Sequence, residues 1–282
     1  MTWTRLHYTC EHEPVDHVVR ELVRLTKNHH EAAARELDDH GSTPLHIFCT
    51  TGFPTPESLQ QLVQYNPAAA LQKDRHGETP LHILCRRHHP LTQEQRAVWQ
   101  VLLQAAPAAA AMANKEGCLP LHVACRHNAS NEMLLQDLLQ AHPNAIRQRI
   151  KLGSPAPRRR PSSLLQHKKI QHIIDPTQGM SHKTESDLHY SLWTQIRDGA
   201  YPLHMAVAAK APLTVVRLLV QAGPPDMLEC TDKFGNTPLH IAYATNVEES
   251  TIAWLQELAP QAAMTPNKQG RLPWQVAQGR RV

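Results

Sequence analysis

The sequence predicts an all-α fold built as a solenoid of repeats. The first observation is a Pro-Leu-His motif that follows a glycine by three residues and recurs along the chain. The glycines of successive copies lie 36, 40, 82, 36 and 35 residues apart, and the sixth opens a degraded copy, GRLPWQVA. The second observation is a helical spacing of apolar residues after each motif, as at Leu59, Leu62 and Val63. Self-similarity at this period is typical of arrays in which each unit stacks on the next.

Each residue of the motif has a local role that favours a turn followed by a helix. Gly77 can take positive φ in a tight turn, Thr79 can cap a helix with its hydroxyl, and Pro80 suits the first helical position. Leu81 is expected to face the core, while the ring nitrogens of His82 can bond to Thr79 and to the adjoining turn. A unit this small cannot bury its own apolar face, so it must stack on its neighbours.

The residues expected to hold the units together are those of the repeated motif. They are Thr43, Pro44, Leu45, His46, Thr79, Pro80, Leu81, His82, Pro120, Leu121, His122, Pro202, Leu203, His204, Thr237, Pro238, Leu239 and His240.

The motif resembles the ankyrin repeat. That family's pattern of Asp, two residues, Gly, one residue and Thr-Pro-Leu-His stands at 38–46, 74–82 and 232–240, and at 114–122 with an Asn start and with Leu119 for the threonine. The resemblance covers nearly the whole chain except 148–198. It implies stacked antiparallel helix pairs joined by protruding turns, with about six units and a C-terminal capping half-unit. It also implies a scaffold that binds another protein without enzymatic activity.

The units follow one another in order along the solenoid, which we expect to span residues 1–282. The expected units are 1–37, 38–73, 74–113, 114–147, 199–231, 232–266 and a half-unit from Gly270. The stretches NPAAALQKDRHG and APAAAAMANKEG share an alanine block between the second helix and the next turn. In the last full unit, Ile252, Leu255 and Leu258 are expected on the buried face. The half-unit is expected to have a polar outer face, supplied by Gln275, Gln278, Arg280 and Arg281.

The regular spacing fails after Gly117, where the next motif comes 82 residues later. We interpret residues 154–196 as a basic, disordered insertion within one inter-repeat turn. The alternative is a degenerate extra repeat, which Pro155, Pro157 and Pro161 disfavour because they exclude a first helix where one is required.

Positive charge concentrates around this insertion. Residues 147–187 contain nine Lys or Arg against three acids, whereas the whole chain has a net charge of +4. A solvated loop would explain this, and so would contact with an acidic protein, nucleic acid, anionic lipid or the nuclear import machinery. Binding of nucleic acid or an anionic membrane through 147–183 is therefore the alternative function. The candidate contacts are Arg158, Arg159, Arg160, Lys168 and Lys169.

Ser162 is a candidate modification site within the same insertion. Arg159 and Arg160 precede it by three and two residues, an arrangement similar to the target pattern of basic-directed kinases. A phosphate there would reduce the loop's positive charge by about 1.5 to 2.

Composition favours a reduced intracellular protein. No run approaches the roughly 18 apolar residues of a membrane helix, and the first 13 residues lack the layout of a signal peptide. Cys10, Cys49, Cys85 and Cys125 each fall three residues after a motif histidine, so they occupy one repeat position and suit small buried thiols. We expect a monomer in the cytoplasm or nucleus.

No motif predicts a metal site, a cofactor or catalysis. The recurring His-x-x-Cys supplies zinc ligand types, but equivalent residues of stacked units lie about 8 to 10 Å apart, too far to share one ion. His12 and His17 are separated by one residue too many for the zinc-peptidase helix motif. Gly-rich phosphate loops and Gly-x-Ser-x-Gly elbows are absent from the sequence.

Overall fold

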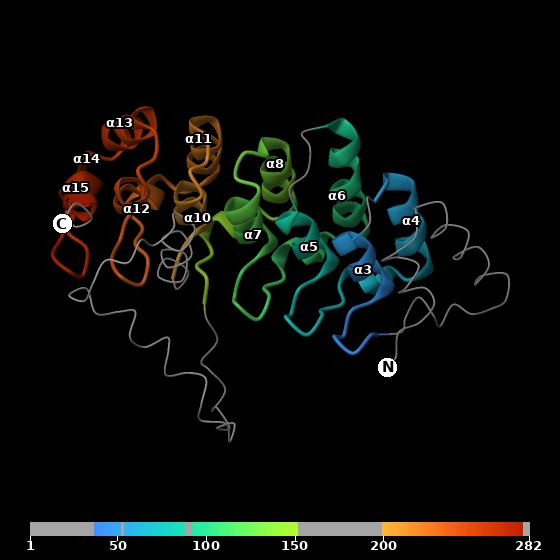
Figure 1. Ribbon diagram of the computed structural model, residues 1–282. Helices are drawn as coiled ribbons and strands as arrows, with labels where there is room; N and C mark the ends of the chain where they lie inside the picture. The colour runs from blue at the N-terminus through green and yellow to red at the C-terminus, as the bar shows by residue number, and fades with distance from the viewer. Residues whose placement is uncertain (1–36, 52–53, 88–91, 152–198, 279–282) are drawn as a thin grey trace, which may run out of the picture.

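The computed structural model describes residues 37–51, 54–87, 92–151 and 199–278, and every regular element in these ranges is a helix. The helices form two parallel rows along one elongated array (Figure 1). In these ranges no helix is long and apolar enough to cross a lipid bilayer.

The first helix of each unit begins at the motif proline, as expected for a residue that lacks an N–H and has a preset φ. These first helices are α3 (Pro44–Thr51), α5 (Pro80–Arg86), α7 (Pro120–His127), α10 (Pro202–Ala208), α12 (Pro238–Thr245) and α15 (Pro273–Gln278). They pack against one another in chain order, with α7 directly against α10.

The second helices form the other row. They are α4 (Pro56–Tyr65), α6 (Gln93–Ala105), α8 (Glu132–Ala141), α11 (Leu213–Ala222) and α13 (Glu249–Leu258). Side-chain oxygens cap three of them, from Thr55, Thr92 and Asn131. In Figure 1 this row stands above the first helices, and the turns project from the lower edge.

A third short helix follows each second helix, and each one starts at a proline. These elements are the 3₁₀ helices η2 (Pro67–Ala70), η3 (Pro107–Ala111), η4 (Pro143–Arg147) and η6 (Pro225–Leu228), and the α-helix α14 (Pro260–Met264). The recurring alanines become buried here, as at Ala69, Ala70, Ala109 and Ala110. Their small side chains let this segment lie close beneath the helix pair.

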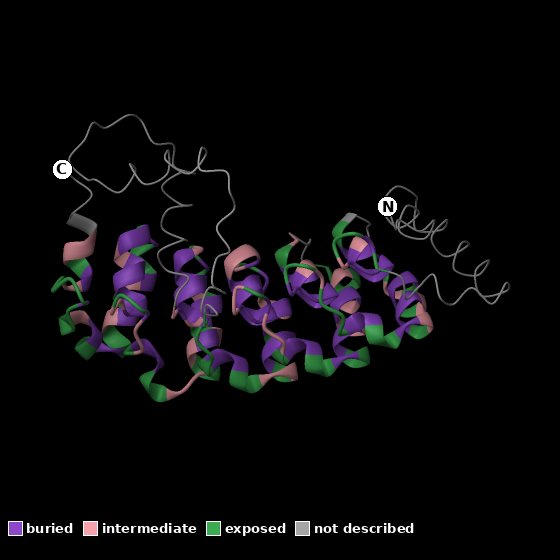
Figure 2. Ribbon diagram, turned by 90° about the horizontal axis from the view of Figure 1, so that it is seen from below, coloured by how far each residue is buried: buried purple, intermediate pink, exposed green. Residues whose placement is uncertain are grey.

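The core runs as a continuous band along the array (Figure 2). The motif leucines are at most 2% exposed, and Trp99 of α6 is fully buried. The prediction that Leu258 is buried was wrong, because its side chain is 52% exposed. It lies at the end of α13, where no described second helix follows to cover it. Trp274 of the half-unit is 44% exposed, so the terminal face is not uniformly polar.

A polar cluster joins two second helices on the outer side of the core. Arg96 of α6 donates through Nε and Nη2 to the two carboxylate oxygens of Asp137 on α8, at 3.0 and 2.7 Å. The Nε1–H of Trp99 and the amide of Gln100 also donate to Oδ2 of Asp137, at 3.0 and 3.2 Å. Burial raises the pKa of Asp137, but these hydrogen bonds outweigh it and hold the pKa below its usual value.

Candidate functional site

The turn before every described first helix except α10 is built around an aspartate or asparagine and a glycine. Oδ1 of Asp74 accepts the backbone N–H groups of His76 and Glu78, both at 2.8 Å, and Gly77 has φ of +73°. The same pair of bonds recurs at the other turn residues with a polar side chain, Asp38, Asn114, Asp232 and Asn267. Oδ1 of the leading residue is thus occupied by hydrogen bonds within its own turn.

Successive turns are joined by backbone hydrogen bonds. The N–H of Arg75 donates to the carbonyl of His40 at 2.8 Å, and the N–H of Lys115 donates to the carbonyl of His76 at 2.9 Å. An added Cβ at Gly77 would lie 2.8 Å from the backbone nitrogen of Lys115. The turns therefore stack closely enough that glycine is required for space as well as for conformation.

The motif histidine joins its own unit to the next one. The backbone N–H and the hydroxyl of Thr79 contact Nδ1 of His82 at 3.2 and 2.9 Å, and Nε2 of His82 lies 3.1 Å from the carbonyl of Cys118. Because a backbone N–H donates to Nδ1, we infer that the proton is on Nε2 and that Nε2–H donates to Cys118. Both bonds that the sequence predicts for His82 are present, one to Thr79 within its own unit and one to the adjoining turn.

Equivalent bonds occur in the other units. Nε2 of His46, His204 and His240 lies 3.0 to 3.1 Å from the carbonyls of Glu78, Asn236 and Arg271. Burial lowers the pKa of His82, His122 and His204 to about 4, and it lowers the pKa of His46 and His240 as well. These rings are neutral at physiological pH and are occupied on both sides, which leaves no ring nitrogen for a substrate or metal.

Three units depart from the threonine-histidine pair without losing the contact, and in the fourth unit the N–H of Leu119 donates to Nδ1 of His122 at 3.2 Å. Tyr201 replaces the threonine of the fifth unit, and its ring stacks on His204 with centroids 5.7 Å apart. In the half-unit, Gln275 replaces the histidine, and its Oε1 accepts the N–H of Leu272 at 2.8 Å. Gln275 was expected to face outward, but it instead reproduces one bond of the histidine.

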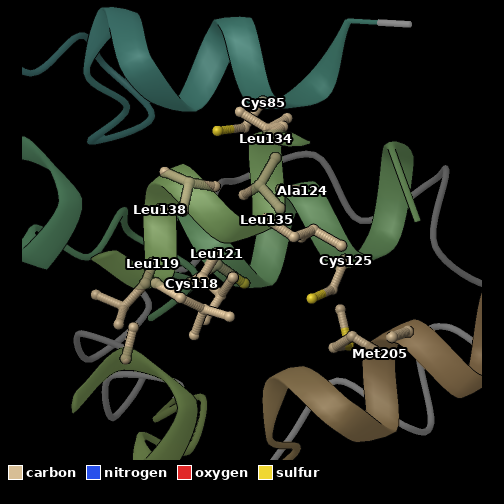
Figure 3. Packing of buried hydrophobic residues seen from close by; sticks show 14 of the residues in the cluster. Cys85, Cys118, Leu119, Leu121, Ala124, Cys125, Leu134, Leu135, Leu138 and Met205 are labelled. Atoms are coloured by element: carbon tan, nitrogen blue, oxygen red, sulfur yellow. The ribbon is translucent and has the colours of Figure 1, made fainter. Parts of the chain in front are cut away.

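The motif cysteines are packed in the core. Cys49, Cys85 and Cys125 are free and fully buried, and Figure 3 shows Cys125 of α7 facing Met205 of α10. Burial raises the pKa of the Cys49 thiol to about 12 and raises that of Cys85 and Cys125 further. Such thiols are neutral and weakly reactive. Within the described ranges, no group of three or more His, Cys, Asp or Glu side chains is arranged to hold a metal ion.

The turn between the fourth and fifth units closes although 47 residues, 152–198, separate its two described ends. The N–H of Ile150 donates to the carbonyl of Ala200 at 2.8 Å, and the N–H of Gly199 donates to the carbonyl of Ile150 at 3.1 Å. Asp74, Gly77 and Glu78 make the same two bonds in an uninterrupted turn. By this correspondence, Lys151 takes the place of Arg75.

Arg149 adds side-chain contacts across this interrupted turn. Its Nη2 donates to the carbonyl of Thr231 at 2.7 Å, and its guanidinium lies 5.4 Å from the ring centroid of Tyr201. The histidine of the fourth unit has a different acceptor. Nε2 of His122 lies 3.0 Å from the carbonyl of Gln148, which precedes the interrupted turn, whereas the other motif histidines contact a carbonyl at the end of the next turn.

The sequence candidates fall into two groups. The motif residues from Thr43 to His240 all lie in the described ranges and form the turns and first helices above. Arg158, Arg159, Arg160, Ser162, Lys168 and Lys169 lie within 152–198, outside the described residues. Of the alternative nucleic-acid or lipid site at 147–183, only 147–151 is described.

The surface left for a partner lies on the turns and on the ends of the first helices. Thr50, Arg86 and Arg126 stand six residues after their motif prolines, and all three are at least partly exposed. We call these three residues the first-helix face. The side chain of Arg86 is 50% exposed and pairs with the buried carboxylate of Glu78. Beside this face, the tips of the turns carry mostly basic side chains.

Comparison with known proteins agrees with this architecture. Family models described as ankyrin repeats match residues 6–103 and 203–256, and the first match covers residues 6–37 of the first expected unit. A crystal structure of the ankyrin repeat domain of Bcl-3, described as a unique member of the IkappaB protein family, has a TM-score of 0.59 and 22% identity, covering 98% of this chain and 94% of that one. A crystal structure of the human ASB11 ankyrin repeat domain has a TM-score of 0.59 and 18% identity, covering 98% and 92%. No curated protein matches the sequence.

Proposed function

Because this chain belongs to the ankyrin-repeat family, we propose that it is a non-enzymatic scaffold that binds another protein through its turns and its first-helix face. Proteins of this architecture present an extended surface made by many equivalent positions of successive units. The observation that carries the proposal is the different location of two kinds of side chain within each unit. The histidine, threonine and cysteine are used inside the array, while charged side chains remain at its surface.

The chemistry of the described residues supports a binding role over a catalytic one. Catalysis by histidine or cysteine needs an accessible nitrogen or a thiolate. His82 is fully buried with both nitrogens occupied, and Cys85 is a buried thiol with a raised pKa. Arg86 and Arg126, by contrast, occupy equivalent positions on the neighbouring helices α5 and α7, and both are at least partly exposed.

The test is to capture the partner from native cells and to measure its affinity for two matched charge-reversal variants. Arg86→Glu/Arg126→Glu changes the first-helix face, and we expect it to weaken binding at least tenfold. Glu94→Arg/Glu132→Arg changes the first turns of α6 and α8 in the other row, and we expect binding within twofold of wild type. Circular dichroism checks that both variants fold. If the first variant binds as tightly as wild type, the first-helix face is not the binding surface.

A further inference from the structure

One position of the turns carries a cation in five consecutive copies. It is the residue directly after the leading Asp, Asn or Ile, and all five side chains are exposed. We call this set the basic turn row: Arg75, Lys115, Lys151, Lys233 and Lys268. The equivalent residue of the first described turn is Asp39, so the row begins at the second turn.

The stacked backbone fixes the spacing of the basic turn row. The N–H groups of Arg75, Lys115 and Lys268 donate to carbonyls of the preceding turns at 2.8, 2.9 and 3.0 Å. Each cation is therefore attached at a point that repeats with the stacking distance of the units, about 8 to 10 Å. Five such points form a line of four intervals along one edge of the array.

The acids of the turns do little to neutralise this line. Asp38 and Asp232 are 6% and 2% exposed, and their Oδ1 atoms accept backbone N–H groups. Asp74 and Glu116 are partly exposed acids that directly neighbour Arg75 and Lys115 along the chain, and Asp39 is exposed in the turn before Arg75. Arg149 and Arg271 are exposed on the same edge and add to its charge.

Acids that are at least partly exposed gather at a different place in four of the units. Glu57, Glu94, Glu132 and Glu249 lie in the first turns of α4, α6, α8 and α13, where a negative charge also suits the helix dipole. A first helix leaves the turn edge, and the second helix starts after the chain has reached the other edge. Cations and acids that alternate along the sequence are thus separated in space, as the course of the chain in Figure 1 shows.

The spacing of the row matches an extended peptide. A peptide in the extended polyproline II conformation rises about 3.1 Å per residue with three residues per turn, so side chains three residues apart point the same way at intervals of about 9 Å. We propose that the basic turn row binds an extended acidic segment of a partner protein with a carboxylate at every third residue. The proposal rests on the protein-binding function above and names the chemistry of the partner.

A peptide fits this edge better than a single-stranded nucleic acid. Sequence-independent binding of single strands combines cations with aromatic side chains on which bases stack. Among the tip residues of the described turns, Phe234 is the one aromatic side chain, with 39% of it exposed. A line of exposed cations with one aromatic ring suits carboxylates, which need no stacking surface.

The test uses a fluorescent 13-residue peptide with glutamate at positions 1, 4, 7, 10 and 13 and neutral residues between them. The comparison peptide has the same composition with the five glutamates contiguous. Fluorescence anisotropy is measured in 0.1 M salt, where the screening length of about 10 Å limits attraction to local pairs. We expect the spaced peptide to bind at least threefold more tightly. Equal affinity of the two peptides would overturn the proposal.

Matched variants show whether the row is the site. Lys115→Gln/Lys151→Gln should weaken the spaced peptide about three- to twentyfold, since exposed ion pairs each contribute modestly. Lys210→Gln/Arg217→Gln removes the same charge from exposed residues outside the row and should leave affinity within twofold. Equal affinity for both variants would reject the row. A six-nucleotide deoxythymidine strand that binds more tightly than the peptide would assign the edge to nucleic acid instead.

The two proposals fail in different ways. If neither peptide binds, but the captured partner loses affinity for Arg86→Glu/Arg126→Glu, the scaffold function stands and the acidic segment is wrong. If the spaced peptide binds through the row, but that first-helix variant leaves partner affinity unchanged, the first-helix face is wrong and the row stands.

Discussion

Arg96 and Asp137 lie 41 residues apart in the sequence and form a two-point ion pair between α6 and α8. The side chain of Asp137 is 6% exposed and that of Arg96 is 29% exposed. Trp99 and Gln100 complete the hydrogen bonds of the carboxylate. This cluster links the third and fourth units on the side away from the first helices.

Replacing Asp137 should therefore destabilise the array. Asp137→Ala leaves Arg96 and the indole N–H of Trp99 without their shared acceptor, and we expect a loss of about 2 to 3 kcal/mol in urea denaturation. Asp226→Ala removes an exposed acid and serves as the control, with an expected change below about 0.5 kcal/mol. A loss below that value for Asp137→Ala would mean that the cluster contributes little.

Two glycines with nearly the same φ should differ in their tolerance of alanine. Gly41 and Gly77 have φ of +71° and +73°, so each substitution has the conformational cost of about 1 to 2 kcal/mol. A Cβ at Gly41 would lie 3.5 Å from the nitrogen of Arg75, an ordinary contact, whereas a Cβ at Gly77 would lie 2.8 Å from the nitrogen of Lys115. We expect Gly77→Ala to unfold at a clearly lower urea concentration than Gly41→Ala. Equal midpoints would show that the turns can move apart without cost.

Acid should unfold the protein because its buried histidines resist protonation. In the folded state the pKa of His82, His122 and His204 is about 4, against roughly 6.5 in an unfolded chain. Between these values the unfolded chain binds more protons, so stability falls as the pH falls, by up to about 1.4 kcal/mol per pH unit for each histidine. The melting temperature should drop progressively from pH 7 to pH 5.

A histidine variant provides the control for this pH dependence. His82→Gln follows the natural glutamine at position 275, whose Oε1 accepts the N–H of Leu272. The variant should be less stable at pH 7 but should show a shallower decline in acid. A melting temperature that is constant from pH 7 to pH 5 in the wild type would contradict neutral buried histidines.

Leucines of the array should contribute to the free energy of unfolding according to their burial. Leu81 is fully buried, and Leu81→Ala should cost about 2 to 5 kcal/mol of unfolding free energy. Leu272 of the half-unit stands at the threonine position of the motif and is only partly buried, so Leu272→Ala should cost less. Urea denaturation of both variants gives the comparison. A loss under 1 kcal/mol for Leu81→Ala would be incompatible with its place in the stacked core.

Residues 152–197 should be removable without loss of the fold. Their deletion joins Lys151 to Asp198 and creates the turn Ile-Lys-Asp-Gly, which has the length of Asp-Arg-His-Gly at 74–77. The backbone bonds between Ile150 and Ala200 already close this turn, and a shorter connection has a smaller entropic cost. We expect a melting temperature equal to or above that of the full chain.

The control deletion removes one residue more. Deleting 152–198 joins Lys151 to Gly199 and leaves the turn one residue short, so its melting temperature should fall. A large decrease for the first deletion as well would show that the segment contributes to the stability of the array.

The turns and first helices could be predicted because their signals are local. Gly77, Pro80 and His82 have conformational and hydrogen-bonding roles that repeat every unit and act within a few residues or across one stacking contact. The family matches and the helical architecture confirm the predicted solenoid. Leu258 was misplaced because a helical spacing marks a face without showing whether a neighbour covers it.

Other features depend on contacts between segments that lie far apart in the sequence, which no local pattern predicts. Arg96 and Asp137 are not part of the motif, and their pairing follows from the alignment of two second helices. The alanine blocks were visible as repeats, but their 3₁₀ conformation was not. The basic turn row escaped a count of charge by segment, because Lys115 and Lys233 stand next to Glu116 and Asp232 and their charges cancel in such a count.

The closed turn at Ile150 and Ala200 also changes what a single cut in the backbone would do. Helix α7 packs against α10, α8 packs against α11, and Arg149 reaches Thr231, all without help from the peptide bonds between 152 and 198. A protease that cleaved there would produce two fragments already docked on each other. In that respect the molecule is a pair of complementary half-arrays. The covalent link between them raises the effective concentration of one half at the other, whereas the contacts between the halves determine how they are arranged.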